Sequence, residues 1–265
     1  PGRVCVAHTS LCQAYSWAGL LQEALECNDI ARRDMQHVQP FERAFFGFSI
    51  ELWALSLRAR LLARMGRTGE ARACLDELLE REATSREPPV PGMSHIGFVD
   101  LAWVLQDAEL AASHARELPK IAEKYGTPYV QVFALGYGGM ASAIAGDHAS
   151  ADRDCTAALK IVRETGAARE FEPELLASVA EAKLRLEEWE AALSYASEAI
   201  GLSRARTTRI AECRGFIARG EAAAALGLDP KPDFAQAEAL VAVTGASIYR
   251  VALERARMVS GVRAV

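Results

Sequence analysis

The chain has 265 residues, a formal net charge of −5 at pH 7 and 51% hydrophobic residues. Such a composition supplies ample material for a core and excludes a disordered polymer. The acidic balance argues against nucleic acid as a partner, because nucleic-acid binding needs a dense basic surface. No stretch reaches the roughly 18 uninterrupted apolar residues that a membrane span requires, so we expect no membrane partner either.

The chain starts with Pro1, Gly2 and Arg3, which is neither an initiator methionine nor the basic-then-apolar pattern of a secretory signal. We therefore expect a cytoplasmic segment of a longer protein. The six cysteines lack CxxC spacing and mostly fall on apolar helix faces, so they are expected to be reduced core residues. The five histidines are scattered without ligand spacing, and we expect neither a metal nor a cofactor.

Five segments repeat one pattern: a first helix, a turn, and a second helix that opens with an acidic residue and alanine. The turn position is occupied by Gly19, Gly66, Gln106, Gly146 and Glu187. Five residues after each turn stand Ala24, Ala71, Ala111, Ala151 and Ala192. Glycine suits the left-handed backbone after a helix end, and alanine allows two antiparallel helices to approach closely. The pattern predicts five helical hairpins, each with an apolar face that only a neighbour can bury.

The remaining segments complete the array. The proline-rich stretch 87–92 is expected to be the loop between the second and third hairpins, and residues 39–47 add further length near it. A sixth hairpin is predicted from a first helix over 209–226, a turn over 229–233, and a helix over 234–243 capped by Asp233. A last helix near 247–259 is expected to cover the end of the stack. The sequence thus predicts one repeat domain over 1–265, with about thirteen helices.

These columns resemble the tetratricopeptide repeat, whose consensus has a glycine at the turn and small residues in the second helix. Tyr15 also falls on the consensus aromatic position, four residues before Gly19. The turns are 47, 40, 40 and 41 residues apart instead of 34, which indicates longer helices. The resemblance implies an all-α, tetratricopeptide-like α-solenoid, with antiparallel hairpins in a right-handed superhelix.

Longer phrases resemble the C-terminal helical-repeat region of bacterial class III adenylate/guanylate cyclases, in which a STAND-type ATPase precedes the array. The phrases are FFGFSIELWALSLRARLLARMGRTGEARACLDELLE (45–80), ALGYGGMASAIAGDHASA (134–151) and RETGAAREFEPELLASVAEAKLRLEEWEAAL (163–193). Related arrays occur in LuxR-type regulators such as the maltotriose-responsive activator. The resemblance implies a non-catalytic sensor or autoinhibitory arm, with any cyclase or ATPase activity in upstream domains.

Three other features could carry chemistry, and each has a plainer structural interpretation. The glycine-rich run 136–139 lacks the strand, lysine and hydroxyl residue of a phosphate loop, which favours close helix packing. Acidic pairs such as Glu172 with Glu174 fit the start of a helix, where the dipole favours negative charge. The arginines at 204, 206, 209 and 214 are expected to form a solvated helix end. We therefore predict no catalytic residues.

The candidate binding surface is the concave face, which first helices line in this repeat family. The repeat frame places on it Trp17, Arg60, Arg64, Asp100, Trp103, Met140, Glu181 and Arg185. Because ionisable side chains are rarely buried without partners, we expect Arg60, Asp100 and Glu181 to face solvent or a ligand. The competing interpretation is salt bridging between neighbouring repeats.

Two functions remain open from the sequence. One is a scaffold that binds a protein or peptide partner, or the upstream domains of the same chain. The other is a sensor that holds a small-molecule effector inside the superhelix.

Overall fold

The computed structural model describes residues 2–39 and 47–261, and the regular structure within these ranges is helical, without a strand. The helices are α1 (Gly2–Ala18), α2 (Leu21–Asp34), α4 (Ile50–Arg64), α5 (Thr68–Thr84), α6 (Met93–Leu105), α7 (Ala108–Ala115), α8 (Leu118–Tyr125), α9 (Pro128–Ile144), α10 (His148–Thr165), α11 (Glu172–Arg185), α12 (Trp189–Arg206), α13 (Arg209–Ala225), α14 (Lys231–Thr244) and α15 (Ile248–Val259). Two short 3-10 helices are η1 (Met35–His37) and η2 (Arg169–Phe171).

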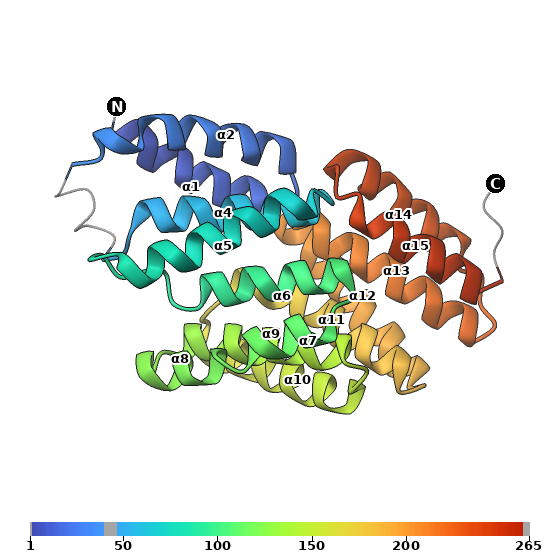
Figure 1. Cartoon of the computed structure of the whole chain (residues 1–265). Helices are drawn as coiled ribbons and strands as arrows, with labels where there is room; N and C mark the ends of the chain where they lie inside the picture. The colour runs from blue at the N-terminus through green and yellow to red at the C-terminus, as the bar shows by residue number, and fades with distance from the viewer. Residues whose placement is uncertain (1, 40–46, 262–265) are drawn as a thin grey trace.

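Consecutive helices pair into antiparallel hairpins that stack side by side (Figure 1). The pairs are α1–α2, α4–α5, α6–α7, α9–α10, α11–α12 and α13–α14; the short helix α8 follows α7 and packs against α9, and α15 follows the last pair. This arrangement confirms the predicted all-α, tetratricopeptide-like α-solenoid. The short helices α7 and α8 together take the place of one second helix, so the fourteen α-helices of the described residues correspond to the thirteen expected.

The turn column of the sequence marks the end of each first helix. All five of its residues have a left-handed backbone, with φ from 55° at Gln106 to 82° at Gly146. Gly227 ends the first helix of the sixth hairpin in the same conformation, with φ 75°. This backbone lets the chain leave one helix and enter the next within a few residues, as the glycine preference at this position indicated.

The alanine column lies at the contact between the two helices of each hairpin. Its five members are between 0% and 2% exposed. A small side chain at this point allows the helix axes to come close, so the column sets the spacing within each hairpin.

Ala151→Leu is expected to lower the free energy of unfolding by about 1–3 kcal/mol, because a larger side chain overpacks a filled seam. Urea denaturation would measure the change. Ala149 lies in the exposed first turn of the same helix, so Ala149→Leu serves as the matched control with a small effect expected. Equal midpoints for the two variants would contradict the assigned packing.

The glycine-rich run lies inside α9 and serves helix packing, as predicted. An added Cβ at Gly136 would lie 2.6 Å from the Phe171 ring, and one at Gly139 would lie 2.6 Å from the sulfur of Cys155. The neighbouring Gly138 has no such neighbour within 4 Å. Two of the glycines are therefore required by close approach, and the third is not.

Two local predictions were wrong. Helix α14 begins at Lys231, so Asp233 is in its first turn and does not cap it. Asp233 instead forms an ion pair with Arg219 at 2.6 Å. Arg214 belongs to no solvated helix end, because it is buried within α13 and ion-paired.

The predicted loop at 87–92 lies between α5 and α6, whereas most of the segment 39–47 is outside the described residues.

The array curls until its C-terminal elements touch its N-terminal turns. Ser247, just before α15, donates a hydrogen bond of 2.8 Å to the carbonyl of Met65 at the α4–α5 turn. A Cβ added to Gly19, at the α1–α2 turn, would lie 3.0 Å from the Cβ of Arg209. This closure brings the first helices of distant hairpins around a shared interior.

Among the described helices, none is both long and apolar enough to cross a membrane.

Candidate functional site

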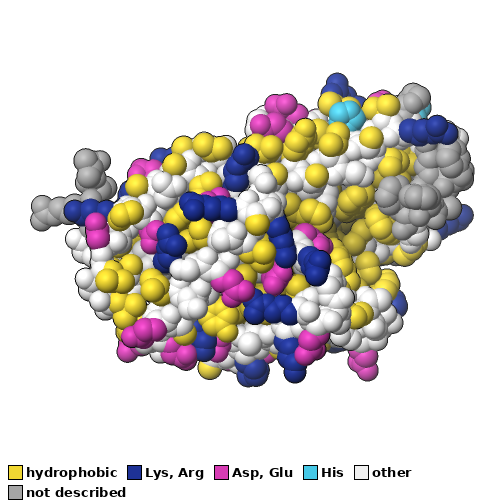
Figure 2. Space-filling view, turned by 180° about the vertical axis from the view of Figure 1, so that it is seen from behind, with side chains coloured by type: hydrophobic (Ala, Val, Ile, Leu, Met, Phe, Trp, Pro, Cys, Tyr) yellow, Lys and Arg dark blue, Asp and Glu magenta, His cyan; other side chains and the backbone are white. Residues whose placement is uncertain are grey.

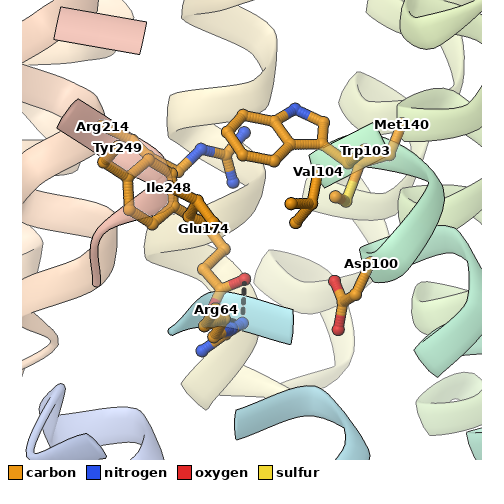
Figure 3. Close-up of a pocket in the computed structure, with 9 residues that line it drawn as sticks. All are labelled: Arg64, Asp100, Trp103, Val104, Met140, Glu174, Arg214, Ile248 and Tyr249. Atoms are coloured by element: carbon orange, nitrogen blue, oxygen red, sulfur yellow. Dashed lines mark hydrogen bonds and ion pairs between the residues drawn. The ribbon is translucent and has the colours of Figure 1, made fainter. Parts of the chain in front are cut away.

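The first helices converge on a small pocket at the centre of the concave face (Figure 3). It is lined by Arg64, Asp100, Trp103, Val104, Met140, Glu174, Arg214, Ile248 and Tyr249. These residues come from α4, α6, α9, α11, α13 and α15. The enclosed space is about 10 Å³, which is near the minimum for one water molecule. The concave face is therefore filled by the protein's own side chains.

Beside the pocket, Arg60 joins three helices through charge-assisted hydrogen bonds. Its Nε donates to Asp100 at 2.6 Å and its Nη2 donates to the Tyr137 hydroxyl at 2.5 Å. Burial by itself lowers the pKa of Arg60, but Tyr137 and Asp100 outweigh burial and the net direction is upward. Burial raises the pKa of Tyr137, so its hydroxyl keeps its proton. Arg60 is thus a fixed cation that holds α4 to α6 and α9.

A second buried pair links helices far apart in the sequence. Nη2 of Arg64 donates to both carboxylate oxygens of Glu174, at 3.0 and 3.1 Å. Burial alone would raise the pKa of Glu174, but Arg64 and other nearby guanidinium groups lower it below its ordinary value. Glu174 is therefore ionised, and the pair ties α4 to α11.

The third pair is bidentate. Arg214 donates to the two carboxylate oxygens of Glu181 at 2.9 and 2.8 Å, and to the Ser178 hydroxyl at 2.9 Å. The parallel geometry is the strongest form of an arginine–carboxylate contact. With this pair the site holds three guanidinium groups and three carboxylates. We call these six residues the ionic layer: Arg60, Arg64, Arg214, Asp100, Glu174 and Glu181. Its charges balance, which makes their burial tolerable.

The first turn of α15 forms part of the pocket lining. The Tyr249 ring lies 5.3 Å from the Trp103 ring between centroids, and Ile248 lies beside it (Figure 3). Tyr249 is buried, and burial raises the pKa of its hydroxyl. The side chains of Ile248 and Tyr249, from the C-terminal helix, thus line the space beside the ionic layer.

The outer surface differs from this interior. Figure 2 shows a face on which basic and acidic side chains are interspersed, with hydrophobic side chains exposed between them. Exposed ion pairs occur on the surface of the molecule, such as Arg163 with Glu198 at 2.5 Å. Exposed pairs of this kind contribute about 0–1 kcal/mol each, so the charges that matter for the architecture are the buried ones.

The predicted concave residues have different fates. Arg64, Asp100, Trp103 and Met140 line the pocket, and Arg60 adjoins it. Two further predicted residues form ion pairs at their own positions, Glu181 with Arg214 and Arg185 with Glu221. Trp17 is not among the lining residues.

The expectation that Arg60 and Asp100 face solvent was wrong. Each is only 8% exposed, because the neighbouring first helix supplies the partner that makes burial tolerable. Pairing between neighbouring hairpins, the competing interpretation, describes this contact correctly. The residues belong to the interior of the closed array and not to an open groove.

Sequence reasoning missed five lining residues: Glu174, Arg214, Val104, Ile248 and Tyr249. The repeat frame carried a signal for the first two. Both stand thirteen residues before their turn, where the earlier hairpins have Trp53, Met93 and Phe133. A charge in a column of large apolar residues indicates a buried pair. The last two had no local signal, because α15 reaches the pocket only through the closure of the array.

The thiols are poorly suited to act as nucleophiles. Burial raises the pKa of Cys12, Cys155 and Cys213 to about 12. The reactive form of cysteine is the thiolate, which such pKa values disfavour. Within the described ranges, no three His, Cys, Asp or Glu side chains come together as a metal site.

Outside the pocket, His95 of α6 and His114 of α7 form a half-buried contact. Their Nδ1 atoms are 3.1 Å apart, and the His114 ring stacks on Phe98 at 3.9 Å between centroids. One Nδ1 must donate a hydrogen and the other accept it, so the accepting ring must be neutral and the two rings cannot both be protonated. Burial, followed by His95 and Arg72, lowers the pKa of His114 to about 4.

This pKa predicts that stability falls between pH 6.5 and about 4. The unfolded chain binds a proton at His114 near its ordinary value of 6.5, whereas the folded chain resists protonation until about 4. The contribution is fully present above pH 6.5 and is lost as the pH falls through this window. An NMR titration of the His114 ring should give a midpoint near 4, and His114→Gln should flatten this part of the urea-stability profile. A midpoint near 6.5 would contradict the prediction.

Comparisons with known proteins identify the fold. A scan of protein-family models and a search of curated proteins found no match to the sequence. Among solved structures, the chain is similar to a Rap protein complexed with competence and sporulation factor, with TM-score 0.64 and 10% identity over 98% of this chain and 81% of that one. It is also similar to Bacillus thuringiensis PlcR in complex with a peptide and DNA, with TM-score 0.60 and 15% identity over 96% and 99% of the two chains.

A third similar structure is a signal transduction ATPase with numerous domains (STAND) from Pyrococcus horikoshii that has a tetratricopeptide repeat sensor. Its TM-score is 0.50 with 13% identity, and the match covers 98% of this chain but 39% of that one. At these identities the likeness establishes the tetratricopeptide-like fold of the present chain and nothing more.

Proposed function

We propose that this chain is a non-catalytic regulatory scaffold that binds a polypeptide on its concave face. The observation that carries the proposal is the occupant of that face. The pocket is lined in part by the first turn of a helix, α15, whose Ile248 and Tyr249 side chains lie among residues of five other helices. A surface that already holds a helix of its own chain has the shape and chemistry to hold a helix or peptide of a partner.

The similar structures support this direction. One was solved with competence and sporulation factor and another with a peptide and DNA. The third is a STAND protein with a tetratricopeptide repeat sensor, and the cyclases that the sequence resembles also combine a STAND-type ATPase with a helical-repeat array. We therefore propose that the array is a cytoplasmic sensor or autoinhibitory arm of a bacterial adenylate/guanylate cyclase, and that nucleotide chemistry belongs to upstream domains.

The size of the pocket weakens the alternative of a small-molecule sensor. Pockets for small ligands commonly enclose about 300–1,000 Å³. The space on the concave face is about 10 Å³ and is surrounded by side chains that already satisfy one another. A polypeptide that takes the place of α15 needs no such cavity, which favours the scaffold.

Selection of peptides from a display library against the full chain would test the proposal. Selected peptides should bind with measurable heat, and Trp103→Ala should weaken them at least tenfold. Tyr125→Ala, an exposed aromatic on α8 outside the pocket lining, is the matched control and should leave their affinity unchanged. Circular dichroism would verify that both variants fold.

Three results would contradict the proposal. The first is a set of peptides that bind equally to both variants. The second is stabilisation by small molecules with no peptide bound. The third is turnover of ATP or GTP by the purified chain that a point substitution within it abolishes.

A further inference from the structure

Helix α15 is attached to the array along one face only. Leu253 and Ala256 are buried against the preceding helices, whereas Val251 and Met258 on its outer face are 70% and 77% exposed. Its N-terminal end is held by the Tyr249–Trp103 contact and by the hydrogen bond from Ser247 to the α4–α5 turn. In Figure 1, α15 lies beside α13 and α14, and only its first turn, with Ile248 and Tyr249, lines the pocket.

The buried residues of α15 follow the pattern of a helix bound in a groove. Tyr249, Leu253 and Ala256 stand at positions i, i+4 and i+7, and each is at most 6% exposed. This spacing places the three side chains in one stripe along the helix. The largest of the three, Tyr249, lies at the pocket, and the smallest, Ala256, lies at the other end of the stripe.

The connection to α14 allows the helix to be released as a unit. Only Gly245, Ala246 and Ser247 separate the two helices, and Gly245 has a left-handed backbone with φ 68°. Removing α15 would break no ion pair of the ionic layer, because all three pairs are made among α4, α6, α11 and α13. It would break the ion pair of Arg257 with Glu238 on α14, at 2.7 Å, and the contact of Tyr249 with Trp103 in the pocket lining.

We propose that α15 is a displaceable internal occupant of a helix-binding site. The external partner is an amphipathic helix that carries an aromatic residue, a leucine and a small residue at positions i, i+4 and i+7. It occupies the site only when α15 has left it. This inference rests on the proposed function, since it assumes that the concave face binds a polypeptide, and it adds the class of partner and the condition for its entry.

A disulfide between position 66, in the α4–α5 turn, and position 247, just before α15, would hold α15 in place. A Cβ added at Gly66 would lie 2.8 Å from the Ser247 hydroxyl oxygen, which is within reach of a disulfide bond. The double variant Gly66→Cys with Ser247→Cys is therefore closed when oxidised and free to open when reduced. The strain of cysteine at the positive φ of Gly66 is present in both forms and cancels in the comparison.

The probe is a fluorescein-labelled synthetic peptide with the sequence of residues 245–261, and its binding to the full chain is followed by fluorescence anisotropy. We expect the oxidised double variant to bind this peptide at least tenfold more weakly than the same protein after reduction. Tyr249→Ala in the full chain weakens the internal contact and should raise affinity for the peptide above that of the unsubstituted chain. A peptide with alanine at the position of Tyr249 should lose at least tenfold.

Equal affinity of the oxidised and reduced forms, or no effect of Tyr249→Ala in either chain or peptide, would overturn the inference. The single variant Gly66→Cys, treated with the same oxidant, shows whether oxidation alone changes binding. Failure here is distinguishable from failure of the proposed function. If library-selected peptides depend on Trp103 but bind the oxidised and reduced forms equally, the concave face binds polypeptides and α15 does not control access.

Discussion

Arg60→Ala is expected to lower the free energy of unfolding by about 3–5 kcal/mol, because it leaves a buried carboxylate without its counter-charge. Asp100 and the Tyr137 hydroxyl both lose their partner in this variant, and both are buried. Urea denaturation of the full chain would measure the change. Arg67→Ala is the matched control, since Arg67 pairs with Glu70 on the exposed surface and its loss should change stability little.

A double substitution separates the charge from the packing. Removing both members of the pair, with Arg60→Met and Asp100→Leu, avoids the unpaired charge and should cost much less than Arg60→Ala alone. The residual loss would come chiefly from the Tyr137 hydroxyl, which also bonds Arg60. If Arg60→Ala and Arg67→Ala lowered stability equally, the ionic layer would not be buried as described.

Gly138→Ala and Gly139→Ala should change stability in opposite directions, although they are neighbours on α9. Alanine is favoured over glycine inside a helix by about 1 kcal/mol, and Gly138 has no atom within 4 Å of an added Cβ, so Gly138→Ala should stabilise. At Gly139 the same methyl group would lie 2.6 Å from the Cys155 sulfur and 3.1 Å from the Ala151 carbonyl. Because the carbonyl belongs to the backbone of α10, the two helices must separate, and we expect a loss of about 1–3 kcal/mol.

Thermal or urea unfolding of the two variants would check this pair, and each serves as the control for the other. Stabilisation by both substitutions would show that α9 and α10 pack less closely than described. Destabilisation by both would show that Gly138 also meets a neighbour.

The sequence predicted the features that depend on residues close together in the chain, and it did not predict the pairing of the ionic layer, which joins residues far apart. The glycine and alanine columns are local, because each turn and each hairpin contact involves residues close together in the chain. Their spacing is therefore enough to predict the helices, the turns and the buried alanines. The same frame also placed Arg64, Asp100, Trp103 and Met140 on one face, and they do line one pocket.

The sequence by itself thus determined the hairpins and the face on which the charged residues lie, since both follow from helical periodicity and from the size of single side chains. Only the tertiary structure decided whether that face is open or filled. The curvature of the array brings Arg64 to Glu174, 110 residues away, and Ser247 to Met65, 182 residues away. Curvature is the sum of small rotations between successive hairpins, and no local pattern records that sum. Because the rotations close the array, residues expected to meet solvent are buried against one another, and α15 covers the surface where a partner was expected.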